Sequence, residues 1–131
     1  MVKENLIKWL SQFPNFQLDE VIQSEITNGD ESYGVSKEPQ TIVEKFIDGS
    51  MKVTEYYSFI GKRLISNNQQ RVKNDKFFEE FENWIHKQDL PDLGEKIICD
   101  ELNISSSNYL QSNDSTYGLY VFTIELEYRK E

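Results

Sequence analysis

The chain has 131 residues, with 23 acidic and 14 basic side chains and a formal net charge of -9 at pH 7. This charge disfavours a free-standing nucleic-acid-binding protein, because phosphate contacts need clustered Lys and Arg. Hydrophobic residues make up 37% of the chain and are patterned along it, which indicates one folded domain over residues 1–131. No apolar run approaches the roughly 18 residues that cross a bilayer, and residues 1–10 lack the apolar core of a signal peptide. We therefore expect a soluble protein that is made in the cytoplasm and enters no membrane.

The first predicted element is a short amphipathic helix at residues 2–13, which Pro14 ends. Its apolar side chains recur at helical spacing: Val2, Leu6, Leu10 and Phe13. Trp9 lies off this stripe. Two interpretations stay open for it: a flank of the core contact, or an exposed residue that contacts a neighbouring subunit.

A strand at residues 19–27 and a polar loop at residues 28–39 are predicted next. The loop contains Tyr33 and Val35 and ends at Pro39. It leads into the clearest hairpin of the chain, which has strands at residues 40–47 and 51–64 and a turn at Asp48-Gly49-Ser50.

Residues 65–73 are predicted to be a polar link, and Asn74 or Asp75 is the expected N-cap of a second helix. Phe78 lies at the margin of the apolar stripe of this helix. The stripe itself consists of Phe77, Phe81, Trp84 and Ile85. This is the helix that we expect to cover the sheet.

Two short strands at residues 97–104 and 108–111 are predicted before the last strand, at residues 117–127. One face of the last strand is apolar and consists of Tyr120, Phe122, Ile124 and Leu126. Thr123, Glu125 and Glu127 lie on the other face, which is typical of a half-buried strand. The element order α-β-β-β-α-β-β-β predicts an α+β fold with a mainly antiparallel sheet covered by two helices.

The residues that commonly carry catalysis are sparse. Cys99 is the only cysteine, and its neighbours Asp100 and Glu101 would raise its pKa, so we expect a structural thiol. His86 is the only histidine and is placed in the last turn of the second helix. No phosphate-binding glycine loop, CxxC pair or HExxH motif is present. We therefore predict no enzyme activity, no metal site and no cofactor.

Acidic residues are predicted to gather on one face of the sheet. Glu125 and Glu127 share a face of the last strand, and Asp100 and Glu101 lie on a possible neighbouring strand. Like charges opposite one another destabilise a sheet. Such a face serves either solubility or a function unrelated to stability, and the sequence leaves both interpretations open.

Five segments follow one another over nearly the whole chain. They are the helix ending near Phe13, Tyr33-Gly34-Val35, residues 52–58 (Lys-Val-Thr-Glu-Tyr-Tyr-Ser), residues 78–85 (Phe-Glu-Glu-Phe-Glu-Asn-Trp-Ile) and residues 117–120 (Tyr-Gly-Leu-Tyr). In order and spacing they resemble the small tail-terminator or tail-completion proteins of phages of Gram-positive bacteria, which are often labelled minor capsid proteins.

The resemblance implies a structural protein that forms a ring, expected to be a homohexamer, at the head-proximal end of a tail tube. Such a ring would end tube polymerisation and join the tail to a connector or to the sheath end. Its partners would be the tail-tube protein and a sheath or connector protein, and DNA would at most pass through the pore. The same parts occur in phage-tail-like bacteriocins. The expected location is thus a virion tail or tail-like particle, assembled in the host cytoplasm.

A cyclic ring needs two dissimilar contact surfaces on each subunit. The candidates for subunit contacts are Trp9, Tyr33, Val35 and Tyr56. Glu125 and Glu127 are candidates for a pore lining that repels DNA. Two alternative functions stay open: a head-to-tail connector or adaptor, and a small acidic inhibitor that mimics DNA and binds a basic partner.

Overall fold

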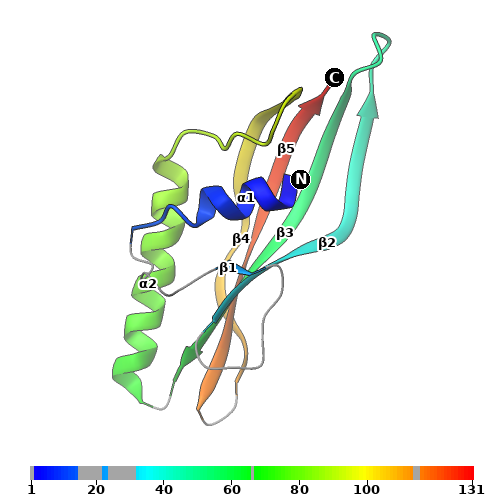
Figure 1. Ribbon diagram of the computed structural model, residues 1–131. Helices are drawn as coiled ribbons and strands as arrows, with labels where there is room; N and C mark the ends of the chain where they lie inside the picture. Colours follow the sequence, from blue (N-terminus) through cyan, green and yellow to red (C-terminus); the bar gives the residue numbers. More distant parts are fainter. Residues whose placement is uncertain (1, 15–21, 24–31, 66, 114–115) are drawn as a thin grey trace.

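The computed structural model describes residues 2–14, 22–23, 32–65, 67–113 and 116–131. Within these residues two helices and five strands follow in the order α1 (Val2–Leu10), β1 (Ile22–Gln23), β2 (Ser32–Lys45), β3 (Met51–Leu64), α2 (Asn68–Lys87), β4 (Ile97–Asn113) and β5 (Tyr117–Lys130). The strands form one sheet in the spatial order β1-β2-β3-β5-β4 (Figure 1). β1 is parallel to β2, and the other pairings are antiparallel. The fold is therefore α+β with a mainly antiparallel sheet.

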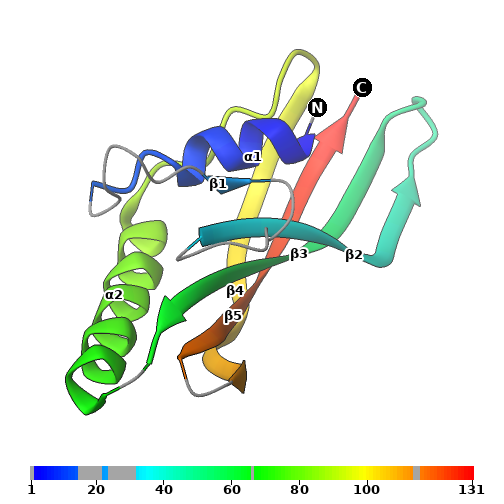
Figure 2. The same cartoon turned by 60° about the horizontal axis from the view of Figure 1, so that its bottom comes forward.

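Side chains of both helices join one hydrophobic core with alternate residues of β3 and β5. Phe59 of β3 lies opposite Phe122 of β5, and their rings stack with centroids 5.0 Å apart. Phe81 of α2 meets both rings edge-on, at 4.9 and 5.6 Å. The α1 helix lies beside β1 (Figure 2), and it buries Leu6 and Leu10 in the same core.

The apolar face predicted for the last strand is buried over its whole length, from Tyr120 to Leu126. Its outward neighbours Thr123, Glu125 and Glu127 are half-buried. This agrees with the predicted alternation, which arises because only one side of the strand faces the helices. β5 extends beyond the predicted end at residue 127, to Lys130.

The buried face of α2 differs from the predicted stripe. Phe78, placed at the margin by the sequence, is fully buried and stacks on Tyr120 at 5.2 Å. Phe81 and Ile85 are also buried, whereas Phe77 and Trp84 are half-buried at the edge of the core. The difference arises because Phe77 and Trp84 turn sideways, towards Tyr33 and the end of α1.

The predicted N-cap of α2 was wrong, because the helix begins two turns earlier. Asn67 is the N-cap, and its Oδ1 accepts a hydrogen bond from Gln70 N at 2.9 Å. Asn74 lies inside the helix and is 3% exposed. Its Nδ2 donates to Leu64 O at 2.9 Å, and its Oδ1 accepts from Arg63 Nε at 3.0 Å. The predicted polar link is therefore mostly the solvent-facing start of α2, fastened to β3 by an asparagine.

The predicted loop at residues 28–39 was wrong over its described part, because β2 begins at Ser32. Tyr33 pairs with Gly61 and Val35 with Phe59, so hydrogen bonding to β3 keeps this segment extended. Pro39 falls at a shift of register between Lys37 and Thr41, a position where a strand tolerates proline. Of the strand predicted at residues 19–27 only β1 is described, and the rest, with residues 28–31, lies outside the described residues.

The two predicted short strands at residues 97–104 and 108–111 are one strand, β4. Its pairing with β5 shifts register at four points, two of them between Ile104 and Tyr109. These irregularities accommodate the serine-rich stretch that the sequence marked as a break. The element order is accordingly α-β-β-β-α-β-β, one strand fewer than predicted. The predicted hairpin is present and β3 has the predicted bounds, whereas β2 runs from Ser32 to Lys45 instead of over residues 40–47.

Candidate functional site

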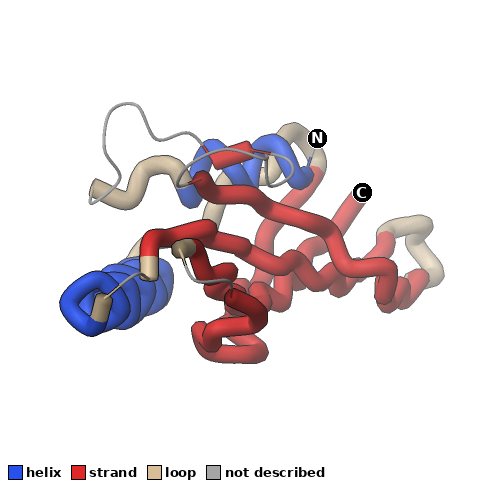
Figure 3. Tube along the Cα trace, turned by 90° about the horizontal axis from the view of Figure 1, so that it is seen from below, coloured by secondary structure: helices blue, strands red, loops and turns tan. Residues whose placement is uncertain are grey.

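One face of the sheet carries no helix among the described residues (Figure 3). We call it the open face. Ile60 of β3 and Val121 of β5 lie opposite each other on it, and the neighbouring stretch at residues 52–58 and 123–127 presents polar side chains that point away from the core: Lys52, Thr54, Tyr56, Ser58, Thr123, Glu125 and Glu127. Most of these side chains are half-buried. A long surface of polar and charged groups is therefore available to a partner or to the lumen of an assembly.

Acidic groups of the open face are partly matched by basic ones. Lys52 Nζ lies 2.7 Å from Glu127 Oε1, and the hydrogen bond and charge of Glu127 raise the pKa of Lys52. Arg129 Nε contacts both carboxylate oxygens of Asp100, at 3.1 and 3.0 Å. The face predicted to be acidic therefore also carries two basic residues, which form salt bridges with two of its acids.

Two acids keep this part of the open face negative. Glu101 lies opposite Glu127 in the register of β4 and β5, and Glu125 lies opposite Asn103. Asp100, Glu101, Glu125 and Glu127 are thus four acids, and the basic residues that face them are Lys52 and Arg129. Like charges placed side by side on neighbouring strands lower stability, so solubility alone is a weak explanation for the pairing of Glu101 with Glu127.

Three of the four predicted contact residues are core residues and cannot serve a neighbouring subunit. Trp9 is 9% exposed, lies 5.5 Å from the ring of Trp84, and donates from Nε1 to Asp89 O at 3.1 Å. Tyr33 and Val35 are 1% and 0% exposed. The sequence predicted a surface position because both stand in a segment taken for a loop. Tyr56 differs: it is half-buried on the open face.

The apolar surface that the structure does expose lies elsewhere, at the end of the β2–β3 hairpin. We call residues 41–50 the hairpin end; it lies beside the C-terminus and carries the turn between the two strands (Figure 1). Four large hydrophobic side chains are exposed there: Ile42 50%, Val43 50%, Phe46 42% and Ile47 108%. None of them was among the contact residues predicted from the sequence. The available signal is the adjacent apolar pairs, which break the period of two expected for a half-buried strand.

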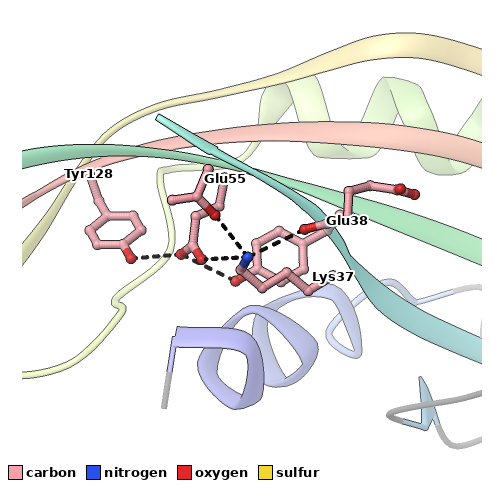
Figure 4. Close-up of polar contacts among 6 residues, drawn as sticks. Lys37, Glu38, Glu55 and Tyr128 are labelled. Atoms are coloured by element: carbon pink, nitrogen blue, oxygen red, sulfur yellow. Dashed lines mark hydrogen bonds and ion pairs between the residues drawn. The ribbon is translucent and has the colours of Figure 1, made fainter. Parts of the chain in front are cut away.

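A polar cluster lies on the core side of the sheet where the hairpin end begins (Figure 4). Glu55 is 7% exposed and accepts hydrogen bonds from Tyr128 OH at 2.6 Å and Tyr57 OH at 3.4 Å. Lys37 Nζ lies 3.4 Å from Glu55 Oε2 and donates to Thr41 Oγ1 at 2.9 Å. The cluster therefore ties β2 to β3 and β5 on both sides of the register shift.

The same cluster affects the protonation of its tyrosines. Burial, and then the Glu55 carboxylate, raise the pKa of both Tyr57 and Tyr128 well above their ordinary value. The hydroxyls therefore stay protonated as hydrogen-bond donors to Glu55. These contacts indicate a structural role, since they join residues of β2, β3 and β5.

Cys99 and His86, the side chains considered for catalysis, lie apart. Burial raises the pKa of Cys99 to about 11, and its Sγ contacts Glu101 O at 3.8 Å. His86 is exposed in the last turn of α2. In the part of the chain that the structure describes, no group of three or more His, Cys, Asp or Glu side chains is placed to hold a metal ion. Neither of the described helices has the length and hydrophobicity that crossing a membrane requires.

A scan of protein-family models finds none that matches the chain, and a search of curated proteins finds no match.

Proposed function

We propose that the protein is a structural subunit of a ring that caps the head-proximal end of the tail tube of a phage or a phage-tail-like bacteriocin. The ring, expected to be a hexamer, ends polymerisation of the tube and joins the tail to a connector or to the end of a sheath. The order of the five segments suggested this function. Its main structural support is the division of the sheet into one face packed by helices and one open face.

The open face suits the wall of a pore. If copies close around an axis with their helices outward, the open faces line the lumen, and the excess of acids over Lys52 and Arg129 makes that lumen negative. A negative wall repels DNA phosphates, so DNA passes without binding, and the repulsion weakens as salt rises. Glu125 and Glu101 contribute most directly, because Glu127 and Asp100 already contact basic groups.

The test combines electron microscopy with a reversal of charge. The purified chain, alone and with tail-tube protein of the same particle, is expected to form closed rings. The variant Glu101→Lys with Glu125→Lys should keep the ring, leave the Lys52–Glu127 bridge intact, and gain DNA binding at low salt. The matched control, Glu79→Lys with Glu95→Lys, changes net charge equally at exposed positions of α2 and the following loop, and should gain much less.

Two outcomes contradict the proposal. One is a chain that stays monomeric both alone and with tube ends. The other is a ring in which both charge-reversed variants bind DNA equally, because the open face would then not line the pore.

The alternative of a DNA-mimicking inhibitor is less well supported. A mimic needs carboxylates that reach a basic partner, whereas Lys52 and Arg129 of this chain already engage two of the acids on the open face. Binding of a basic partner by the monomer, lost at high salt and in the Glu101→Lys, Glu125→Lys variant, would favour the mimic over the ring.

A further inference from the structure

The hairpin end exposes apolar side chains on both faces of the sheet. Val43 lies opposite Val53 on the core side, and Ile42 lies opposite Thr54 on the open face. Val53 is 6% exposed, whereas Val43, one strand further out, is 50% exposed. At this end of the sheet the core thus stops at β3, although β2 contributes Tyr33 and Val35 to the core further along. Strands that are apolar on both faces are normally covered on both, and the described part of this chain covers neither face here.

The size of this surface is that of an interaction site. Ile42, Val43, Phe46 and Ile47 together expose on the order of 400 Å² of surface, divided between the two faces of the hairpin; contiguous apolar patches of a few hundred Å² are often functional. A stable interface buries about 800 Å² on each partner. The hairpin end would supply about half of one partner's share.

The charge of this region identifies the partner that it accommodates best. The hairpin end carries Glu44 and Asp48 against Lys45, and Lys52 lies opposite Glu44 across the hairpin, so residues 41–52 together are neutral in a chain of net charge -9. Two copies of such a chain repel each other over most of their surface. A second copy meets the least repulsion where the surface is both neutral and apolar.

The hairpin end is also ordered before any partner binds. Asp48 Oδ1 accepts from Ser50 N at 2.9 Å and from Ser50 Oγ at 2.6 Å, and Gly49 takes the positive φ of 92° that the turn requires. Phe46 N donates to Ser50 O at 2.9 Å. Little conformational freedom remains to be lost on docking, which favours binding.

From these four observations we propose that the hairpin end is the surface by which one copy of this chain docks onto a second copy, burying Ile42 and Ile47 at the contact. The proposal rests on the proposed ring function and names the contact that holds neighbouring subunits together. The acceptor on the second copy is a different surface, since a closed ring uses heterologous contacts.

The test compares two variants that carry polar substitutions at exposed apolar positions. Ile42→Thr with Ile47→Ser alters the hairpin end, and Val72→Ser alters an apolar side chain of α2 that is 66% exposed. Self-association is measured by sedimentation velocity and native mass spectrometry over a concentration series. The hairpin-end variant is expected to raise the dissociation constant at least tenfold, on the order of what losing an interface anchor costs. Val72→Ser is expected to leave it unchanged, and all variants to unfold at the wild-type temperature.

A second measurement reports burial directly. Ile47→Cys in a Cys99→Ser background is labelled with an environment-sensitive fluorophore, whose emission should shift to the blue as the chain assembles. If wild type and the hairpin-end variant form rings equally well, or the emission does not shift on assembly, the docking proposal is overturned while the ring proposal stands. If the chain forms no assembly either alone or with tail-tube protein, both proposals are overturned.

Discussion

Replacing Glu55 with Ala removes the acceptor that two buried tyrosine hydroxyls share. The bond from Tyr128 is short, at 2.6 Å, and the bond from Tyr57 is long, at 3.4 Å. A buried hydroxyl left without a partner costs about 1–3 kcal/mol. The lost contact with Lys37 adds little, because the side chain of Lys37 is 36% exposed and can be hydrated. We expect Glu55→Ala to lower the free energy of unfolding by about 3 kcal/mol, or the unfolding temperature by roughly 10 °C.

A double-mutant cycle isolates the contact with Tyr128. Tyr128→Phe removes the donor, so that in the double variant with Glu55→Ala no hydroxyl is stranded at this position. The double variant should therefore lose about 1–2 kcal/mol less than the sum of the single losses. Urea unfolding followed by tryptophan fluorescence measures each value, since Trp9 and Trp84 lie in contact at the core.

Glu79→Ala, at an exposed position of α2, is the matched control and should change stability by less than about 0.5 kcal/mol. A loss below about 1 kcal/mol for Glu55→Ala, or strictly additive single losses, would refute the reasoning. Either result would mean that the tyrosine hydroxyls find other acceptors and that the cluster does not fasten the strands.

Three further predictions follow from individual contacts. Gly61→Ala should destabilise the fold by about 1–3 kcal/mol in urea unfolding, because a Cβ there would lie 2.4 Å from Cζ of the buried Phe78 ring; an unchanged midpoint would contradict this. Cys99, whose pKa burial raises to about 11, should react with a disulfide reagent at pH 8 at least about tenfold more slowly in the folded than in the urea-unfolded chain; equal rates would contradict this. Since the pKa of Tyr57 and Tyr128 is raised on folding, the folded state binds more protons than the unfolded state above pH 10, the ordinary pKa. The unfolding temperature should therefore fall as the pH rises past 10, and less steeply in Tyr128→Phe.

The last strand was predictable because its two sides meet different surroundings. One side of β5 packs under the helices and the other stays open, so the sequence alternates with a period of two from Tyr120 to Glu127. β2 carries a weaker local signal. Gly34 and Pro39 suggest a loop, and only the pairing with β3, distant in sequence, keeps Tyr33 and Val35 extended and buried.

The start of α2 was also not predictable from local sequence. Several asparagines between residues 67 and 74 are acceptable N-caps by type. Asn74 or Asp75 was predicted, whereas Asn67 is the N-cap in the structure. Asn74 is instead placed by its contacts with Arg63 and Leu64 of β3. These contacts depend on how the helix lies against the sheet, which local sequence does not encode.

The candidate contact residues were predicted from residue type, and type alone does not separate core from interface. By residue type, Trp9 and Tyr33 suit a buried core as well as a subunit interface. The hairpin end was missed for the opposite reason: adjacent apolar residues such as Ile42 and Val43 resemble a strand buried on both faces. That they lie at an edge of the sheet follows from the pairing of β2, because among the described residues β1 pairs with it only at Tyr33 and Gly34.

The position of Glu55 links the stability of the fold to assembly. Its contact with Lys37 joins β2 to β3, and its contact with Tyr128 joins β3 to β5, at the register shift where the hairpin end begins. If these contacts are lost, the turn of the hairpin end remains, but the base of the hairpin end becomes more mobile. Docking must then restrict this motion, which costs conformational entropy. Gly61→Ala disturbs β3 further from the hairpin end, next to Phe78.

At a temperature where both variants are folded, Glu55→Ala should therefore weaken self-association several-fold more than Gly61→Ala, even when both lose similar stability. Sedimentation velocity on the two variants provides the comparison. Equal effects would mean that assembly depends on the overall stability of the fold and not on the rigidity of the hairpin end.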